Sequence, residues 1–118
     1  MVLGASPKSY RYSNKVVLVL QEAGFEVIPM GINPGNIGSQ RIYDLYQKPP
    51  FSDIHTITIY LNKRNQEEWY DYIIDLMPGR VIFNPGSENP EFYRLLELSG
   101  IEFEEACTLV MLTTGSYI

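Results

Sequence analysis

Apolar positions follow two different periods along this chain. Short apolar or β-branched stretches at residues 1–3, 25–30, 55–61 and 80–83 have the composition of strands. Between them, apolar residues recur at intervals of three and four, as they do in helices that pack on a sheet. This alternation of strand-like and helix-like segments predicts parallel βαβ units.

Two longer helices are predicted from periodicity and end signals. The first covers residues 14–23, with Ser13 as a possible N-cap and Gly24 at its end. The second covers residues 65–77, where Trp69 and other apolar residues fall at intervals of three, one, three and one.

The remaining segments are shorter. Asn89 is predicted to cap a helix that has Pro90 in its first position. The apolar residues within 39–46 predict a further short helix. The last strand is expected at residues 101–103 or 108–112, and the second segment is favoured because it is more apolar.

These elements predict one domain over residues 1–118, with a three-layer, Rossmann-like α/β fold. Right-handed crossovers give a doubly wound parallel sheet of about five strands in the order 3-2-1-4-5, with residues 55–61 as the third strand. Ligands bind such sheets beyond the carboxyl ends of the strands. The loops expected there are residues 4–12, 31–38, 61–64 and 84–88.

The first of these loops has the composition of an anion site. Gly4, Ala5 and Ser6 are small enough for backbone N–H groups to approach a phosphate, and a helix N-terminus follows. Three basic residues, Lys8, Arg11 and Lys15, lie in or just after the loop, and no acidic residue precedes Glu22. The simpler alternative is an ordinary strand-to-helix corner, since the spacing lacks the second and third glycines of G-x-G-x-x-G.

Composition and charge narrow the function. The net charge of −5 argues against nucleic acid as a partner, but residues 1–64 carry +3 (seven basic, four acidic) and residues 65–118 carry −8 (two basic, ten acidic). Anion binding is therefore expected in the first half. No apolar run is long enough for a membrane span and no leader is recognised, so a cytoplasmic location is expected. One cysteine and one histidine predict no metal site.

A set of short motifs occurs in order along the whole chain: Gly4-Ala5-Ser6, Ser13-Asn14-Lys15, residues 24–29, Asn33-Pro34, Gly38, Ile42-Tyr43, Asn84-Pro85-Gly86, Asn89 and residues 107–110. Together they resemble the small, single-domain CoA-binding proteins related to the CoA-binding domain of the succinyl-CoA synthetase α subunit. The resemblance implies a fold that holds the ADP moiety of coenzyme A, with the diphosphate on the turn at residues 4–6 and Asn33-Pro34 beside the adenosine.

NAD is the main competing ligand for this fold. An NAD site has an acidic residue at the end of the second strand, and residues 28–31 contain none. CoA or an acyl-CoA is therefore preferred, with its 3′-phosphate near Lys8 and Arg11, or near Arg41 if the second loop folds inward. Tyr10 or Tyr12 could stack on the adenine, although most tyrosines are expected in the core margin or at interfaces.

The expected function is a non-catalytic CoA-binding or sensing module. The alternative is a small enzyme that acts on a CoA thioester or another nucleotide-containing ligand at the same site. His55 and Cys107 are expected to be structural. A homodimer or an unidentified protein partner is permitted by the apolar and tyrosine-rich composition. The expected binding residues are Gly4, Ala5, Ser6, Lys8, Arg11, Tyr12, Ser13, Asn33, Pro34, Leu61, Asn84 and Gly86.

Overall fold

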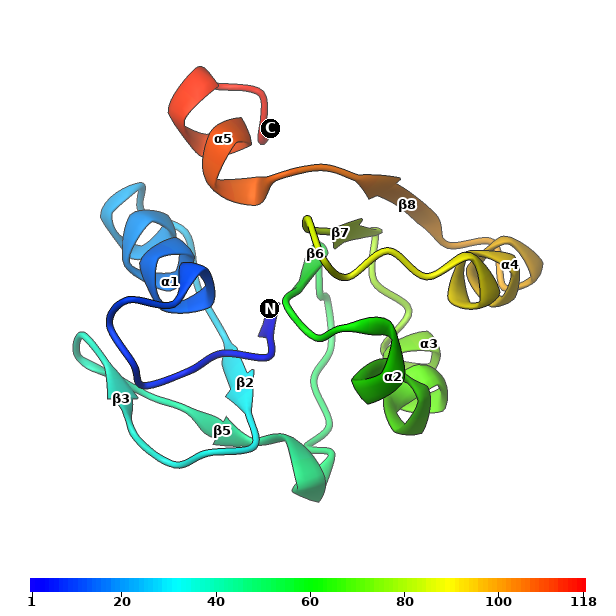
Figure 1. Cartoon of the computed structure of the whole chain (residues 1–118), viewed down its shortest axis with the longest axis horizontal. Coiled ribbons are helices and arrows are strands. Elements are labelled where there is room, and N and C mark those ends of the chain that lie inside the picture. The colour runs from blue at the N-terminus through cyan, green and yellow to red at the C-terminus, as the bar shows by residue number, and fades with distance from the viewer.

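A six-stranded parallel sheet forms the centre of the molecule (Figure 1). The structure is a computed structural model that describes all of residues 1–118. The strand order is β5-β2-β1-β6-β7-β8, which confirms the predicted α/β, Rossmann-like fold. The strands are β1 (Val2–Leu3), β2 (Pro29–Gly31), β5 (Tyr43–Asp44), β6 (Thr56–Ile59), β7 (Arg80–Phe83) and β8 (Glu102–Glu105). A separate hairpin pairs β3 (Asn36–Ile37) with β4 (Gln40–Arg41).

Helices cover both faces of this sheet. On one face, α1 (Tyr12–Glu22) packs beside α5 (Thr108–Thr114). The other face carries α2 (Lys63–Gln66), η2 (Glu67–Trp69), α3 (Tyr70–Leu76) and α4 (Pro90–Leu98). A short 3-10 turn, η1 (Leu45–Gln47), follows β5. No helix is both long and apolar enough to cross a lipid bilayer.

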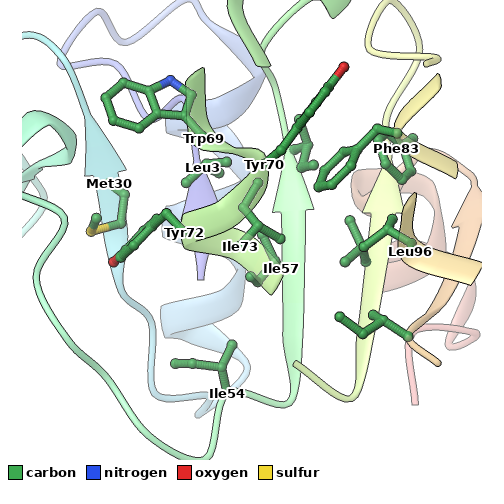
Figure 2. Packing of buried hydrophobic residues seen from close by; sticks show 14 of the residues in the cluster. Leu3, Met30, Ile54, Ile57, Trp69, Tyr70, Tyr72, Ile73, Phe83 and Leu96 are labelled. Carbon is green, nitrogen blue, oxygen red and sulfur yellow. The ribbon is translucent and has the colours of Figure 1, made fainter. Parts of the chain in front are cut away.

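Two apolar clusters fill the spaces between the layers, as the predicted periodicities require. Val16, Val17 and Leu20 of α1 are buried against one face of the sheet. On the other face, Ile73 and Leu96 lie over strand residues such as Ile57 (Figure 2). Residues spaced at three and four on a helix therefore meet residues spaced at two on a strand, which is the arrangement that buries both.

The predicted strand order is confirmed, but the residues assigned to the third strand were wrong. In chain order the main sheet reads 3-2-1-4-5-6, with one strand more than expected. Residues 55–61 contain β6, which lies beside β1 in the middle of the sheet rather than at its edge. The third strand is the short β5, where Tyr43 pairs with Met30, within a segment predicted to be helical. Ile42 and Leu45 are buried in this segment while Tyr43 and Tyr46 are exposed, and only the 3-10 turn that begins at Leu45 is helical.

The choice between the two candidate last strands was also wrong. Residues 102–105 form β8, whereas residues 108–114 form α5. Thr108 and Met111 are buried one helical turn apart, which suits a helix. Three of the four residues of β8 are exposed glutamates, a composition that natural proteins use on edge strands to discourage unwanted pairing.

The predicted helix ends are partly confirmed. Asn89 caps α4, because its side chain accepts a hydrogen bond from Phe92 N–H, and Pro90 is the first helical residue. Ser13 does not cap α1, whose N-cap is Arg11 without a side-chain hydrogen bond. The segment predicted as one helix over residues 65–77 is divided among α2, η2 and α3, and Met77 is exposed beyond the last turn rather than buried.

Candidate functional site

The carboxyl ends of all six strands lie at one edge of the sheet, because the strands are parallel. The chain moves from β1 to β2 and β5 on one side, then returns to β6, β7 and β8 on the other. The switch point therefore lies between β1 and β6, where ligands of such sheets bind. The loops after β1, β2, β6 and β7, which hold the predicted binding residues, all lead away from this edge.

The turn directly after β1 is fixed by the backbone of β2. The N–H groups of Gly4 and Ala5 both donate to the carbonyl oxygen of Met30, at 2.8 and 2.9 Å. The prediction left these two N–H groups free to approach an anion, and the structure instead uses them to join β1 to β2. Gly4 has a φ of +95°, a left-handed conformation that favours glycine.

Unpaired backbone donors lie further along the loop. The N–H groups of Tyr12 and Ser13, in the first turn of α1, have no hydrogen-bond partner in the chain. The loop before them is held by Asn14, whose side chain donates to the Ser6 carbonyl at 2.9 Å, and by Lys8 N–H, which donates to Ser6 Oγ at 3.2 Å. The start of α1 therefore offers an anion two free N–H groups and the positive end of an 11-residue helix.

Basic and aromatic side chains surround these donors. Lys8, Arg11 and Lys15 are all exposed. The Arg11 guanidinium lies 5.6 Å from the ring centre of Tyr10, and the Lys15 ammonium lies 5.5 Å from that of Tyr12. Both rings are about two-thirds exposed, so neither is buried in the core. Cationic and aromatic groups are thus presented together on the solvent side of the loop.

A cavity of about 610 Å³ lies beside the carboxyl ends of β2 and β5. Its volume is within the range of pockets that hold small molecules. Two of the predicted binding residues, Asn33 and Pro34, line this cavity. Arg41, the alternative residue for the 3′-phosphate, lines it too, and Asp44 contributes a carboxylate. The full lining is Gly31, Ile32, Asn33, Pro34, Gln40, Arg41, Ile42, Tyr43, Asp44 and Gln47.

Two close approaches join the cavity to the first loop. A Cβ atom on Gly31 would lie 2.2 Å from the Ala5 carbonyl oxygen, and one on Gly35 would lie 2.6 Å from Pro7 Cβ. Only glycine fits at such distances. The loops after β1 and β2 are therefore packed directly against each other.

The three remaining predicted residues lie on the other side of the switch point. Leu61 is half-buried, and its Cδ2 would be 3.1 Å from a Cβ atom on Gly4. Asn84 is 1% exposed, so its side chain faces the interior. Gly86 is exposed, and its N–H donates to the Glu88 carboxylate at 2.9 Å. None of the three lines the 610 Å³ cavity.

Asn84 uses its whole amide within the chain. Its Nδ2 donates to Thr58 Oγ1 at 2.6 Å and to the Ile59 carbonyl at 2.9 Å, while its Oδ1 accepts from Thr108 N–H at 2.9 Å. Thr58 Oγ1 and Thr108 Oγ1 also lie 2.7 Å apart. Asn84 was predicted to contact the ligand, but its side chain ties β6, β7 and α5 together.

A comparison with known protein families identifies the family of this chain. The family model described as "CoA binding domain" matches residues 1–113. The chain belongs to the CoA-binding domain family. The family resemblance inferred from the sequence is thereby confirmed. No curated protein sequence matches the chain.

Solved structures agree with this assignment. A structure titled only as an uncharacterized protein is 41% identical, with a TM-score of 0.93, and the match covers 98% of this chain and 93% of that one. A conserved hypothetical protein from Pyrococcus furiosus is 26% identical, with a TM-score of 0.80 and coverages of 92% and 94%. A hypothetical protein from Pyrococcus horikoshii OT3, at 21% identity, has a TM-score of 0.84 and coverages of 96% and 80%, which indicates the shared fold alone.

The residues at this edge fit the ligand that the CoA-binding domain family implies. The cavity is large enough for a nucleoside, and the free N–H groups of Tyr12 and Ser13 suit a diphosphate. Four basic side chains, those of Lys8, Arg11, Lys15 and Arg41, lie in the two loops that meet here. These groups would hold CoA by its phosphates, and the reactive thiol would be supplied by CoA itself.

The two residues considered for chemistry lie apart from the cavity. His55 is exposed just before β6, at the opposite edge of the sheet, with Nδ1 2.7 Å from Thr56 Oγ1. Cys107 is half-buried at the start of α5 and therefore precedes a helix, whereas the prediction had it precede a strand. No group of three or more histidine, cysteine, aspartate or glutamate residues could hold a metal ion.

A set of buried polar residues was missed by the sequence analysis. Gln66 is fully buried and Asn89 is fully buried beside it, with Asn89 Nδ2 donating to Gln66 Oε1 at 2.9 Å and to Tyr70 Oη at 2.8 Å. A signal for Gln66 exists in the sequence. It precedes Trp69 and Ile73 by three and seven residues, which places a polar side chain on the apolar face of the helix.

Proposed function

We propose that this protein binds coenzyme A or an acyl-CoA through its ADP moiety and acts as a non-catalytic binding or sensing module. The observation that carries the proposal is the packing of the loop after β1, which leads to the free N–H groups of α1, against the loop after β2, which supplies residues to the 610 Å³ cavity. Membership of the CoA-binding domain family supports it independently.

The adenosine is proposed to occupy the cavity beside β2 and β5. Asn33 and Pro34 line the cavity, and the Gln47 amide can hydrogen-bond to a base, whereas the Gln40 amide already pairs with Gln21 and with the Val27 carbonyl. The single carboxylate of the lining, Asp44, already accepts a hydrogen bond from Tyr46 N–H at 3.0 Å. Neutral polar groups therefore dominate the contacts available to adenine.

The phosphates are proposed to bind along the loop that follows β1. The diphosphate would face Tyr12 N–H and Ser13 N–H, where the positive end of α1 favours negative charge. Arg41 is the basic residue that lines the cavity, so the 3′-phosphate is assigned to it. Lys8 and Arg11 would add longer-range attraction that salt screens.

The lining of the proposed adenosine cavity holds no paired acid–base groups. The lining contains no histidine, cysteine or lysine, and its acid is Asp44 alone. An enzyme that acts on a thioester at this site would need a nucleophile or a general base near the reacting carbonyl. Such a group would have to come from outside the cavity lining.

Calorimetric titration with CoA, 3′-dephospho-CoA, NAD and ADP at two salt concentrations tests this function. CoA should bind most tightly, by about tenfold over 3′-dephospho-CoA, because a charge-assisted hydrogen bond contributes about 1.5 to 3 kcal/mol. Arg41→Gln should remove that preference. Arg94→Gln, which neutralises an exposed arginine on α4, is the matched control and should keep it.

The outcomes separate the two functional classes. If none of the four ligands binds, the proposed function is wrong and the first loop is only a corner of the fold. If CoA thioesters are hydrolysed or transferred with saturation kinetics, and a single cavity variant abolishes this, the enzyme alternative replaces the binding module.

A further inference from the structure

The loops after β6 and β7 are joined by one buried side chain. Gln66 Nε2 donates to the Leu61 carbonyl at 2.8 Å and to the Ser87 carbonyl at 2.7 Å. Its Oε1 accepts from Asn89 Nδ2 at 2.9 Å. Gln66 is fully buried, so these bonds are made away from water, where leaving a polar group unpaired is costly.

The Leu61 end of this connection reaches the turn that follows β1. Gly4 lies so close to Leu61 that a Cβ atom on the glycine would be 3.1 Å from Leu61 Cδ2 and 3.1 Å from the Tyr60 carbonyl carbon. A shift of the Leu61 loop would therefore directly displace the turn between β1 and α1. A contiguous line of contacts runs from Ser87 through Gln66 and Leu61 to Gly4.

The geometry points to Gln66 as a positioning residue for the part of CoA beyond its adenosine, an inference that rests on the proposed function. A ligand with its adenosine beside β2 and β5 and its diphosphate at the start of α1 has passed the first loop. Continued in the same direction across the sheet edge, its pantetheine arm would reach the β6 side of the switch point, where Leu61 lies. Gln66 does not line the adenosine cavity, so it can act on the arm alone.

An amide is the group that this position requires. The two hydrogens of Nε2 face two carbonyl oxygens, and Oε1 faces an amide donor. A glutamate would present an acceptor to both carbonyls, and methionine, at similar volume, would offer the two carbonyls no donor, while Asn89 would keep its hydrogen bond to Tyr70. Gln66→Met therefore releases the loop without creating a cavity.

The experiment compares two ligands on wild-type protein and Gln66→Met. CoA contains the pantetheine arm, and 3′-phospho-ADP contains the adenosine, the diphosphate and the 3′-phosphate without that arm. Gln66→Met should weaken CoA binding by about tenfold or more, because a displaced positioning group is costly. The affinity for 3′-phospho-ADP should change by less than about twofold.

A second variant keeps the test decisive if Gln66→Met fails to fold. Leu61→Ala leaves the Gln66 hydrogen bonds in place, since Gln66 contacts the Leu61 carbonyl, and it should show the same selective loss of CoA affinity. Gln47→Met, in the adenosine cavity, is the control and should weaken both ligands together.

Three outcomes overturn the inference. Parallel weakening of both ligands by Gln66→Met or Leu61→Ala would mean that these residues act only through stability. Unchanged CoA binding in folded Gln66→Met would remove the positioning role while leaving the proposed function intact. If wild-type protein binds neither ligand, the proposed function fails and this inference fails with it.

Discussion

The two sides of the carboxyl edge are built differently. On the side of β6, β7 and β8, buried amides of Asn84, Gln66 and Asn89 hold the loops through side-chain hydrogen bonds. On the side of β1, β2 and β5, the loops are held mainly by backbone contacts and glycine packing, and their basic and tyrosine side chains are exposed. The chain thus combines a fixed side with a side whose functional groups face solvent.

This difference indicates that the two sides contribute to ligand binding in different ways. On the side of β6, β7 and β8, every buried side-chain nitrogen and oxygen is paired, so its geometry is set before any ligand arrives. The exposed groups on the other side can adapt to phosphate and base. The following experiments test or sharpen this contrast.

The largest effect is expected for Asn84→Leu. The variant removes a buried amide that makes three side-chain hydrogen bonds and leaves Thr108 N–H and the Ile59 carbonyl unpaired. The free energy of unfolding should fall by about 3 kcal/mol or more. Urea denaturation measures it. Asn33→Ala on the exposed side should change it by less than about 0.5 kcal/mol, and equal losses in the two variants would contradict the contrast.

Gly31→Ala is expected to have the next largest effect. The added methyl would lie 2.2 Å from the Ala5 carbonyl oxygen, so β2 and the first loop would have to separate. Stability should fall by about 2 kcal/mol, as for other overpacked sites, and CoA affinity should fall with it. Gly86→Ala is the control, because no atom lies within 4 Å of its added methyl and only its φ of +96° opposes the change. Calorimetry measures the CoA affinity of both variants, and thermal unfolding measures their stability.

Hydrogen exchange should distinguish the two sides in the wild-type protein. The N–H groups of Ser87 and Thr108 are buried and paired, so they should exchange slowly. Those of Tyr12 and Ser13 have no partner in the chain and should exchange quickly. Addition of CoA should slow exchange at Tyr12 and Ser13 in particular. Unchanged exchange there under saturating CoA would exclude the start of α1 as the phosphate site.

The smallest expected effect is at alkaline pH. Burial, together with the 2.7 Å hydrogen bond to Glu105, raises the pKa of Tyr93 to about 12. The folded state therefore keeps this proton more tightly than the unfolded state, whose tyrosines ionise near 10. The resulting stability is fully present below pH 10 and is lost as pH rises toward 12. Tyr93→Phe should make the decline between pH 10 and 12 shallower, and denaturation at several pH values would show no difference if the bond were unimportant.

The sequence predicted the fold well because most of its elements have strong local signals. Asn89-Pro90 marks a helix start, and the β-branched run at residues 55–61 marks a strand. The signal failed for β5, which has two residues and depends on pairing with β2. It failed again at residues 108–114, where apolar composition alone fits either a strand or a short helix.

For the candidate site, the sequence predicted which loops lie at the carboxyl edge of the sheet but not the direction of each group. Small side chains at Gly4 and Ala5 indicate a tight turn, yet only the fold shows that their N–H groups point at Met30. Asn84 has the same composition signal whether it faces a ligand or the core. Which way an amide points depends on long-range partners such as Thr108, 24 residues away in the chain.

The contact between the first turn and β2 has a consequence for sequence variation within the family. It is made by main-chain atoms, namely the Met30 carbonyl and the N–H groups of Gly4 and Ala5. Such a contact does not depend on which side chains its residues carry, provided that they fit the space around them. Substitutions at Ala5, Ser6 and Met30 that fit the surrounding space would therefore leave the turn in place. A side chain at Gly4 or Gly31 would instead press against neighbouring atoms and move it.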